Sequence, residues 1–307
     1  MNVARINRVV TAALFLLLFP PSPFISASGA KDVVVIKGYN IKPFNDVIAG
    51  FSPVCGCRIT EMVSSELDEA DIAREIRTIR PAAVFAVGTE ALSLTGSIRH
   101  IPVIFAMVPN PQSVLNEGKN VSGISMNIPP ERYLNELNRV LPNVKRVGLV
   151  YDPRKTGKYV KRALNAAGAL GITLTAKEVN GPRDVVSVIQ KMKGEIDLFW
   201  MLPDSTAITP ETVEFLFYFS FENRIPLLAF AEKYADMGAL MSLSIDNADA
   251  GRQAGELCRR VLEGGVSNDP PGVIAPEKAV LTINLKTANK MSIPVKDNAL
   301  NGARIVR

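Results

Sequence analysis

The sequence predicts an α/β fold with two similar lobes, each a parallel sheet with helices on both faces, joined by a multi-strand hinge. Three observations lead to this prediction. Strand-like and helix-like segments alternate from residue 33 onward, which is typical of parallel sheets. The alternation comes in two runs of similar length, and 307 residues suffice for two lobes of ordinary domain size. Hydrophobic residues make up 47% and charged residues 21% of the chain, which is a globular composition.

The first run opens with an apolar segment at residues 33–36, of the kind found in buried parallel strands. A helix face follows, because Phe44, Val47, Ile48 and Phe51 recur at the spacing of one helical stripe. The remaining elements are read in the same way. We expect a helix over 72–79 that stops at Pro81, a strand at 83–87, a helix from 89, and a strand at 102–108.

The second run starts near residue 129 and repeats the pattern, and the tail then departs from it. Strands are expected at 147–151, 172–179, 196–202 and 227–230, and helix faces at 133–141, 160–167, 185–192 and 211–221. The tail adds strands at 239–245 and 279–283 and helices at 249–263 and 286–291. Such a tail can return the chain to the first lobe and then to the second. Several crossings would make a hinge, with a ligand in the cleft at the carboxyl ends of the strands.

Residue types that carry catalysis are scarce. The only histidine, His100, stands in a loop just before a predicted strand. One histidine and three scattered cysteines do not have the usual spacing of a zinc site. The sequence has neither a Gly-x-Ser-x-Gly elbow nor a Walker A motif, and no Gly-x-Gly-x-x-Gly follows the first strand. We therefore predict a protein that is not an enzyme, with no catalytic residue, no metal site and no cofactor.

Polar and aromatic side chains follow the ends of the predicted strands. In a two-lobed α/β protein these ends face the cleft, so we expect a ligand site there. Asp204 would hold an ammonium group, and Tyr151 or Phe230 would stack on a ring. The alternatives are an N-cap role for Thr89 and a turn-capping role for Asp204 before Thr209. The expected ligand-binding residues are Tyr39, Thr89, Glu90, Asn110, Tyr151, Asp204, Ser205, Thr206, Phe230 and Tyr234.

The three cysteines do not form a disulfide framework, because their number is odd. Cys258 lies on the apolar side of a predicted helix, which favours a small buried hydrophobe. Cys55 and Cys57 are either a local disulfide or two free thiols, and the sequence leaves both open.

Residues 1–30 have the features of a signal peptide. Arg5 and Arg8 give a basic start, an apolar run covers 9–19, and Ser28-Gly29-Ala30 places small residues at the cleavage positions. The run is shorter than the about 20 residues of a membrane span, and an uncleaved anchor is the alternative. We expect an exported, periplasmic protein. The formal net charge of +5 falls by two without this segment, and basic residues are mixed with acidic ones, so we expect no nucleic-acid partner.

Ordered stretches across residues 31–305 carry a family resemblance. They are residues 80–89 (RPAAVFAVGT), 101–105 (IPVIF), 120–124 (NVSGI), 141–148 (LPNVKRVG), 223–227 (NRIPL), 237–240 (MGAL) and 281–284 (LTIN). On these stretches the chain resembles the ABC transporter substrate-binding protein family, whose better-known members bind aromatic amino acids such as tryptophan and tyrosine. The resemblance implies the type I periplasmic-binding-protein fold. It also implies a first lobe of 31–125 plus 242–276 and a second of 126–241 plus 277–307.

The function that the resemblance implies is capture of a small molecule, such as an amino acid or aromatic solute, by a monomer that delivers it to an ABC permease in the membrane. An exported ligand-sensing module of the same fold, signalling to a membrane partner, is the alternative. Some positions depart from the family pattern. Asn110 stands where an aspartate is usual, and Lys155, Gly157 and Lys158 stand where glutamate, asparagine and serine are frequent. These departures affect the ligand more than the fold, and the two lysines would favour an acidic or uncharged ligand.

Overall fold

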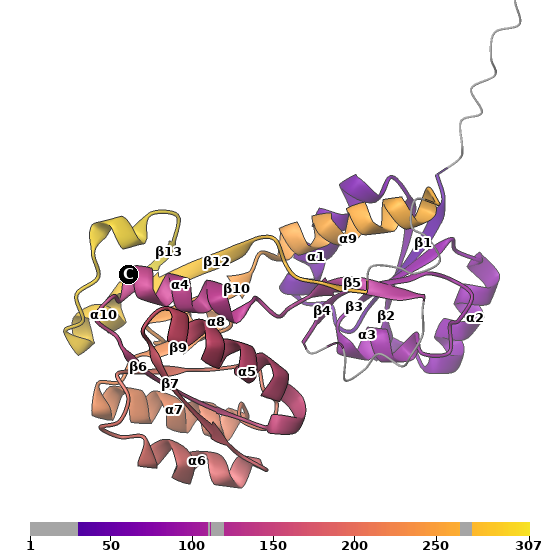
Figure 1. Ribbon diagram of the computed structural model, residues 1–307. Coiled ribbons are helices and arrows are strands. Elements are labelled where there is room, and N and C mark those ends of the chain that lie inside the picture. Colours follow the sequence, from indigo (N-terminus) through magenta and orange to yellow (C-terminus); the bar gives the residue numbers. More distant parts are fainter. Residues whose placement is uncertain (1–29, 110, 112–119, 265–271) are drawn as a thin grey trace, which may run out of the picture.

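The computed structural model describes residues 30–109, 111, 120–264 and 272–307. The described chain forms two lobes, each built on one sheet (Figure 1). The predicted signal peptide, apart from Ala30, lies outside the described residues, and so does Asn110. In the part of the chain that is described, no helix is long and apolar enough to cross a membrane.

The first sheet has six strands, all parallel, in the order β11-β5-β4-β3-β1-β2. Its strands are β1 (Asp32–Lys37), β2 (Arg58–Val63), β3 (Ala83–Val87), β4 (Val103–Val108), β5 (Val121–Ser125) and β11 (Val273–Ile274). Its helices are α1 (Lys42–Cys55), α2 (Glu69–Ile79), α3 (Thr89–Leu94) and α9 (Asn247–Leu262), with a 3-10 turn η1 (Ser64–Glu66).

Burial on both faces explains why the strands of this sheet appear as continuous apolar runs. Val33 and Val35 of β1 belong to the core beneath α1 and α9, whereas Val34 and Ile36 belong to the core beneath α2 and α3. Side chains alternate between faces along a strand, so each position needs an apolar residue when helices cover both faces. The edge strand β2 is mostly exposed and lacks such a run, which is why it was not predicted.

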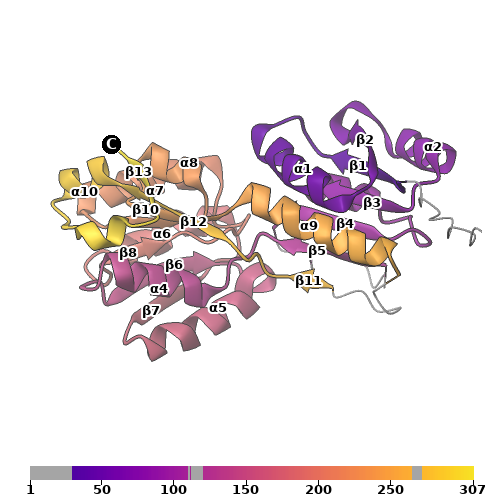
Figure 2. The same ribbon diagram turned by 90° about the horizontal axis from the view of Figure 1, so that it is seen from above.

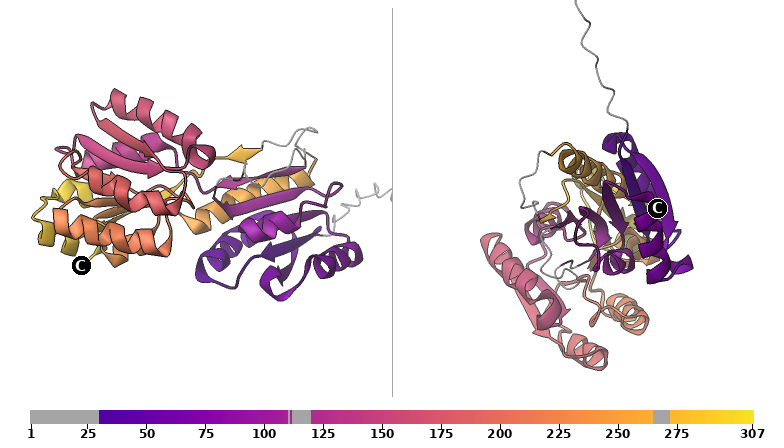
Figure 3. Two further views of the ribbon diagram at one scale, coloured as in Figure 1. Left: turned by 90° about the horizontal axis from the view of Figure 1, so that it is seen from below. Right: turned by 90° about the vertical axis from the view of Figure 1, so that its right-hand side faces the viewer.

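The second sheet has seven strands in the order β13-β12-β10-β9-β8-β6-β7. Its strands are β6 (Arg146–Tyr151), β7 (Thr173–Glu178), β8 (Leu198–Trp200), β9 (Leu227–Ala229), β10 (Met241–Ile245), β12 (Ala279–Asn284) and β13 (Arg304–Val306). Its helices are α4 (Pro130–Val140), α5 (Pro153–Ala169), α6 (Pro182–Lys191), α7 (Pro210–Asn223), α8 (Glu232–Met237) and α10 (Leu285–Met291), with a 3-10 turn η3 (Asp297–Leu300). Helices lie on both sides of this sheet (Figure 3, left).

The predicted α/β fold with two lobes is confirmed, with one departure from a purely parallel arrangement. Strand β12 pairs antiparallel with β10. The reason is the path of the chain. After β10 the chain leaves for the first lobe from the carboxyl-terminal ends of the parallel strands. It returns to the second lobe at these same ends, so β12 must run in the direction opposite to β10.

The described chain crosses between the sheets three times, at residues 126–129, at Asp246 and at 275–278. Figure 2 shows α9 leaving the second lobe and lying along the first. The lobe boundary near residue 242 differs from the one expected from the resemblance. Strand β10, which ends at Ile245, is hydrogen-bonded within the second sheet, so the chain changes lobe after that residue.

Three glycines allow α1 and α9 to pack with their backbones in contact. A Cβ atom on Gly50 would lie 2.0 Å from the Ala248 carbonyl oxygen, and one on Gly251 would lie 1.9 Å from the Val47 carbonyl oxygen. On Gly255 it would lie 2.7 Å from the Phe51 carbonyl oxygen. This contact anchors the long helix that follows the second crossing onto the first lobe.

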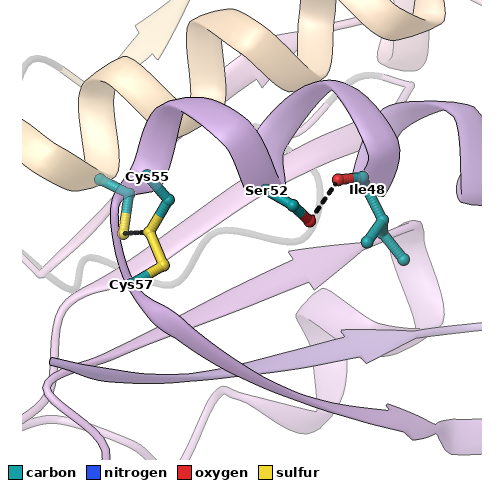
Figure 4. Close-up of a disulfide and its surroundings, with 5 residues drawn as sticks. Ile48, Ser52, Cys55 and Cys57 are labelled. Atoms are coloured by element: carbon teal, nitrogen blue, oxygen red, sulfur yellow. Dashed lines mark hydrogen bonds between the residues drawn. A yellow bond between two sulfur atoms is a disulfide. The ribbon is translucent and has the colours of Figure 1, made fainter. Parts of the chain in front are cut away.

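A disulfide joins Cys55 and Cys57 at the end of α1 (Figure 4), so the structure selects one of the two states that the sequence left open. Cys258 of α9 is a buried free thiol, as expected from its place on the apolar side of the helix. Its sulfur lies 3.9 Å from the sulfur of Cys55. Burial raises the pKa of the Cys258 thiol to about 12.

Candidate functional site

A cleft of about 710 Å³ lies where the two lobes meet. Its lining comes from α1 and the end of β4 in the first lobe, from α4, α5, α8 and the loops after β8 and β9 in the second, and from two of the crossings. The lining residues are Lys42, Pro43, Met107, Pro109, Met126, Asn127, Ile128, Tyr133, Tyr159, Pro203, Asp204, Ser205, Ile208, Phe230, Ala231, Glu232, Lys233, Asp236, Ser244, Ile245 and Asn247.

Two tyrosines form an aromatic wall on the second-lobe side of this cleft. The hydroxyl of Tyr133 donates to the Leu243 carbonyl over 2.8 Å, and that of Tyr159 donates to the Ile128 carbonyl over 2.9 Å. Both rings pack on the buried Trp200, with centroids 5.2 and 6.2 Å away. Burial raises the pKa of both tyrosines far above the usual value, so both hydroxyls stay protonated and keep donating. The rings, and not the hydroxyls, are therefore left to contact a ligand.

Met107 lines the cleft from an unusual backbone position. Its φ is 60°, in the left-handed region that bulky residues rarely adopt. The pairing of β4 with β5 shifts register between Phe105 and Val108, around this residue. An irregularity of this kind re-aims a side chain and is frequent beside functional sites.

Uncharged polar side chains line the cleft where the chain crosses between lobes. Asn127 belongs to the first crossing, and Ser244 and Asn247 flank the second. Among the described residues none of these three side chains has a hydrogen-bond partner, although the Asn127 backbone N–H donates to Ser125 Oγ. They are available to a ligand as donors and acceptors.

Asp204 lines the cleft, but its carboxylate is taken up by the protein. One oxygen accepts from the backbone N–H groups of Thr206 and Ala207 over 2.9 and 3.2 Å. The other accepts from the Asp152 backbone N–H over 2.9 Å and from the Thr156 hydroxyl over 2.6 Å. The residue is only 1% exposed. These contacts fill the four acceptor positions of a carboxylate and favour the capping role over an ammonium partner.

The neighbouring Asp152 completes a buried polar network behind the cleft. It caps α5 by accepting from the Arg154 backbone N–H, and it also accepts from the Arg154 guanidinium and the Thr206 hydroxyl. The guanidinium, followed by the other donors, holds the pKa of the Asp152 carboxyl well below its usual range. Ser205 lines the cleft beside this network and accepts a hydrogen bond from Lys155 Nζ over 2.7 Å.

Of the predicted site residues of the first lobe, Tyr39, Thr89 and Glu90 lie outside the cleft lining, and Asn110 lies outside the described residues. Tyr39 is 53% exposed, and its hydrogen bond to the Glu90 carboxylate raises the pKa of the tyrosine. Thr89 is the first residue of α3 and Gly88 is its N-cap, with a φ of 98° that suits glycine. The N-cap role that was the alternative for Thr89 therefore belongs to Gly88, one position earlier. Tyr39 and Glu90 are brought together at the ends of β1 and β3, but not with the second-lobe residues.

The predicted second-lobe residues divide between the lining and its support. Asp204, Ser205 and Phe230 line the cleft, whereas Tyr151, Thr206 and Tyr234 do not. The Tyr151 hydroxyl contacts Glu178 over 3.0 Å, and its pKa is raised by burial and by that carboxylate. Tyr234 is buried against Phe230, with ring centroids 5.2 Å apart, so it positions the lining ring.

Sequence reasoning missed the tyrosines and the crossing residues of the cleft. Tyr133 was read as one member of an apolar helix face, which its burial justifies. Asn127 follows β5, a strand that was not predicted as an element. The available signal was a polar residue between two apolar ones, Met126 and Ile128, just before a helix that opens with Pro130.

The other charged lining residues also have partners within the chain. Lys42 pairs with Asp46 at 2.6 Å, and Lys233 lies 4.9 Å from the centre of the Tyr234 ring. Glu232 and Asp236 both pair with Arg304, at 2.8 and 2.9 Å.

No cluster of three or more histidine, cysteine, aspartate or glutamate side chains suited to a metal ion occurs within residues 30–109, 111, 120–264 and 272–307. His100 is exposed in the loop before β4.

The chain belongs to the ABC transporter substrate binding protein family, whose model matches residues 60–306. It is 24% identical over 219 residues to a tyrosine-binding protein of Clostridioides difficile (strain R20291), a match that spans 68% of this chain and 63% of that protein.

Solved structures show the same fold. The ligand-free, open structure of a substrate binding protein with adhesive properties from Clostridium difficile has a TM-score of 0.73 and 18% identity, over 91% of this chain and 99% of that one. The ABC domain in complex with L-Trp from Streptococcus pneumonia has a TM-score of 0.64 and 20% identity, over 91% of this chain and 100% of that one. The expected type I periplasmic-binding-protein fold is confirmed.

Proposed function

We propose that this protein is the exported solute-binding component of an ABC importer, which captures a small molecule between its lobes and catalyses no reaction. The observation that carries the proposal is the cleft of about 710 Å³, which is lined from both lobes and from two crossings. Its volume lies in the range of about 300–1,000 Å³ that is typical of sites for one small molecule.

Capture by such a protein requires the lobes to close, and the three crossings support a hinge. Tyr133 and Tyr159 donate to main-chain carbonyls beside the first two crossings, so they hold these segments to the second lobe while the first lobe rotates. On closure, Tyr39, Thr89 and Glu90 would approach the second lobe, because they follow the carboxyl ends of strands in the first sheet. Their predicted contact with ligand is a proposal for the closed state.

The relatives support a ligand of amino-acid or aromatic size. One is named as a tyrosine-binding protein and another was solved with L-Trp. The apolar and aromatic side chains Met107, Tyr133, Tyr159 and Phe230 in the lining agree with that size and character.

Export is the second part of the proposal. The signal-peptide features of residues 1–30 support it, and the Cys55–Cys57 disulfide suits an oxidising compartment. Protein recovered from the periplasm should begin at Lys31 in mass spectrometry. An intact Met1 on that material would contradict a cleaved signal.

The binding role is tested with a thermal-shift screen of amino acids, amines, nucleosides and carboxylates on the mature protein. Each stabilising compound is then measured by small-angle X-ray scattering, where closure lowers the radius of gyration. Incubation with the ligand should leave it chemically unchanged. If no compound in a broad screen stabilises the protein or changes its scattering, the solute-capture proposal is wrong.

Delivery to a permease is tested by uptake of the identified ligand in cells with and without the gene. Loss of uptake in the deletion strain supports an importer. Unchanged uptake, with a ligand-dependent change in gene expression, would support the sensing role instead. Light scattering of the eluted protein tests the expected monomer.

A further inference from the structure

We infer that Cys57 is a site of covalent modification by small disulfides such as oxidised glutathione, and that Cys258 exposes this site by displacing Cys57 from Cys55. The sequence contains three cysteines, and all three meet at one place in the first lobe. None of them lines the cleft, so the modification site is separate from the proposed capture site.

The packing of α9 on α1 holds Cys258 against the disulfide. A Cβ atom on Gly255 would lie 3.4 Å from the backbone nitrogen of Cys55, so the two helices touch near the disulfide (Figure 4). Cys258 lies three residues further along α9, on the same face of the helix. Its sulfur is 3.9 Å from that of Cys55, and a bond between them requires an approach of about 2 Å. A small movement of two side chains is therefore sufficient.

The three cysteines differ in their access to solvent. Cys258 is 0% exposed and Cys55 is 3% exposed, so both sulfurs are shielded from a dissolved reagent. Cys57 follows the end of α1, directly before the edge strand β2, and is half-buried. The free thiol is thus the shielded one, whereas the partly accessible sulfur is held in the disulfide. Exchange between them has to come before reaction with a reagent.

The exchange moves the disulfide bond of Cys55 from Cys57 to Cys258. The Cys258 thiol releases its proton to solvent, and the resulting thiolate attacks the sulfur of Cys55. The Cys55–Cys57 bond breaks, and its electron pair leaves on Cys57 as a thiolate. This thiolate attacks the small disulfide, which oxidises it to a mixed disulfide and releases one small thiolate. The released thiolate takes up a proton from solvent, so protons and electrons balance.

The new bridge restrains the unfolded chain more than the original one does. The Cys55–Cys57 disulfide joins residues two positions apart, whereas a Cys55–Cys258 bridge joins residues 203 positions apart. In the chain-entropy account, closing a longer loop removes more entropy from the unfolded state. Capture of Cys57 as a mixed disulfide also draws the exchange forward, because the original disulfide cannot re-form while Cys57 is blocked.

Peptide mapping of the mature protein tests this inference. The protein is incubated with excess oxidised glutathione at pH 8.5, quenched with acid and digested without reduction. We expect a glutathionyl group on Cys57 together with a bridge between Cys55 and Cys258. A glutathionyl group on Cys258 with the Cys55–Cys57 disulfide intact would overturn the inference, and so would the absence of any adduct.

The pH dependence of adduct formation identifies the attacking group. Burial raises the pKa of the Cys258 thiol to about 12, so below that pH its thiolate fraction increases about tenfold with each pH unit. The rate should therefore still rise about tenfold from pH 9 to pH 10, where an ordinary thiol of pKa about 8.5 is already mostly ionised. A rate that levels off by pH 9 would contradict attack by Cys258.

Two serine variants serve as controls. Cys55→Ser frees Cys57 and leaves Cys258 in the core, so iodoacetamide should alkylate Cys57 and spare Cys258. Equal alkylation of both would overturn the shielding on which the exchange depends. Cys258→Ser removes the attacking thiol and should take up no glutathione. An adduct on Cys57 in that variant would show that the disulfide is opened from outside and would reject the role of Cys258.

Discussion

Replacing Gly251 by alanine puts a methyl group into the tightest contact between α1 and α9. The new Cβ would lie 1.9 Å from the Val47 carbonyl oxygen and 2.8 Å from its carbon, whereas ordinary contact begins at 3.4 Å. The two helices would have to separate by roughly 1.5 Å, because the obstacle is backbone and cannot rotate away. Overpacking of this kind costs up to about 3 kcal/mol, and alanine returns about 1 kcal/mol of helix propensity. We expect the free energy of unfolding to fall by about 2 kcal/mol.

The assay is urea denaturation followed by circular dichroism, with Gly168→Ala as the matched control. Gly168 lies in α5, is exposed, and has nothing within 4 Å of its would-be Cβ. The same chemical change should there raise stability by about 0.5–1 kcal/mol. If Gly251→Ala is as stable as the wild type or more so, the described packing of α1 on α9 is wrong.

Further outcomes follow from the cysteines and the buried carboxylates. In Cys57→Ser, an added oxidant such as oxidised glutathione should take two electrons and two protons from the thiols of Cys55 and Cys258 and leave them cross-linked, because these sulfurs lie 3.9 Å apart. Non-reducing peptide mapping that finds only uncross-linked Cys55 and Cys258 would refute that proximity. Asp204→Asn should lower the unfolding free energy by at least about 2 kcal/mol, because an amide nitrogen would replace an oxygen that accepts two hydrogen bonds. An unchanged melting temperature would contradict the capping role. The depressed folded-state pKa of Asp152 adds stability that is present above its unfolded pKa of about 3.9 and is lost as the pH falls below that value. Acid titration of unfolding should show this loss, and Asp152→Asn should reduce it.

Much of the fold followed from the sequence because its central strands are buried on both faces. β1, β3 and β4 are covered by helices on each side, so each appears as an apolar run with no polar alternation. β2 is exposed at an edge, and β5 is a five-residue strand in which Gly123 and two serines interrupt the apolar pattern. Local composition could not identify either strand, because neighbours distant in the sequence determine their pairing.

The sequence predicted the cleft residues only where they directly follow the carboxyl end of a predicted strand. Asp204, Ser205 and Phe230 follow β8 and β9 in a parallel sheet, and topology alone directs those loops to the cleft. Topology does not determine which side chains within such a loop point into the cleft. Thr206 follows the same strand but turns inward to Asp152, because a buried carboxylate needs its hydroxyl.

The sequence by itself determined the α/β class, the two lobes and the scarcity of catalytic side chains, since periodicity and composition are local properties of the chain. Only the tertiary structure decided that β12 runs antiparallel, that Cys55 pairs with Cys57, and that Tyr133 faces a cleft. It also decided that the Asp204 carboxylate is consumed by four donors, two of which come from Asp152 and Thr156, about fifty residues away. Burial and hydrogen bonding depend on which distant segments meet in the fold. The residue type at a single position does not contain that information.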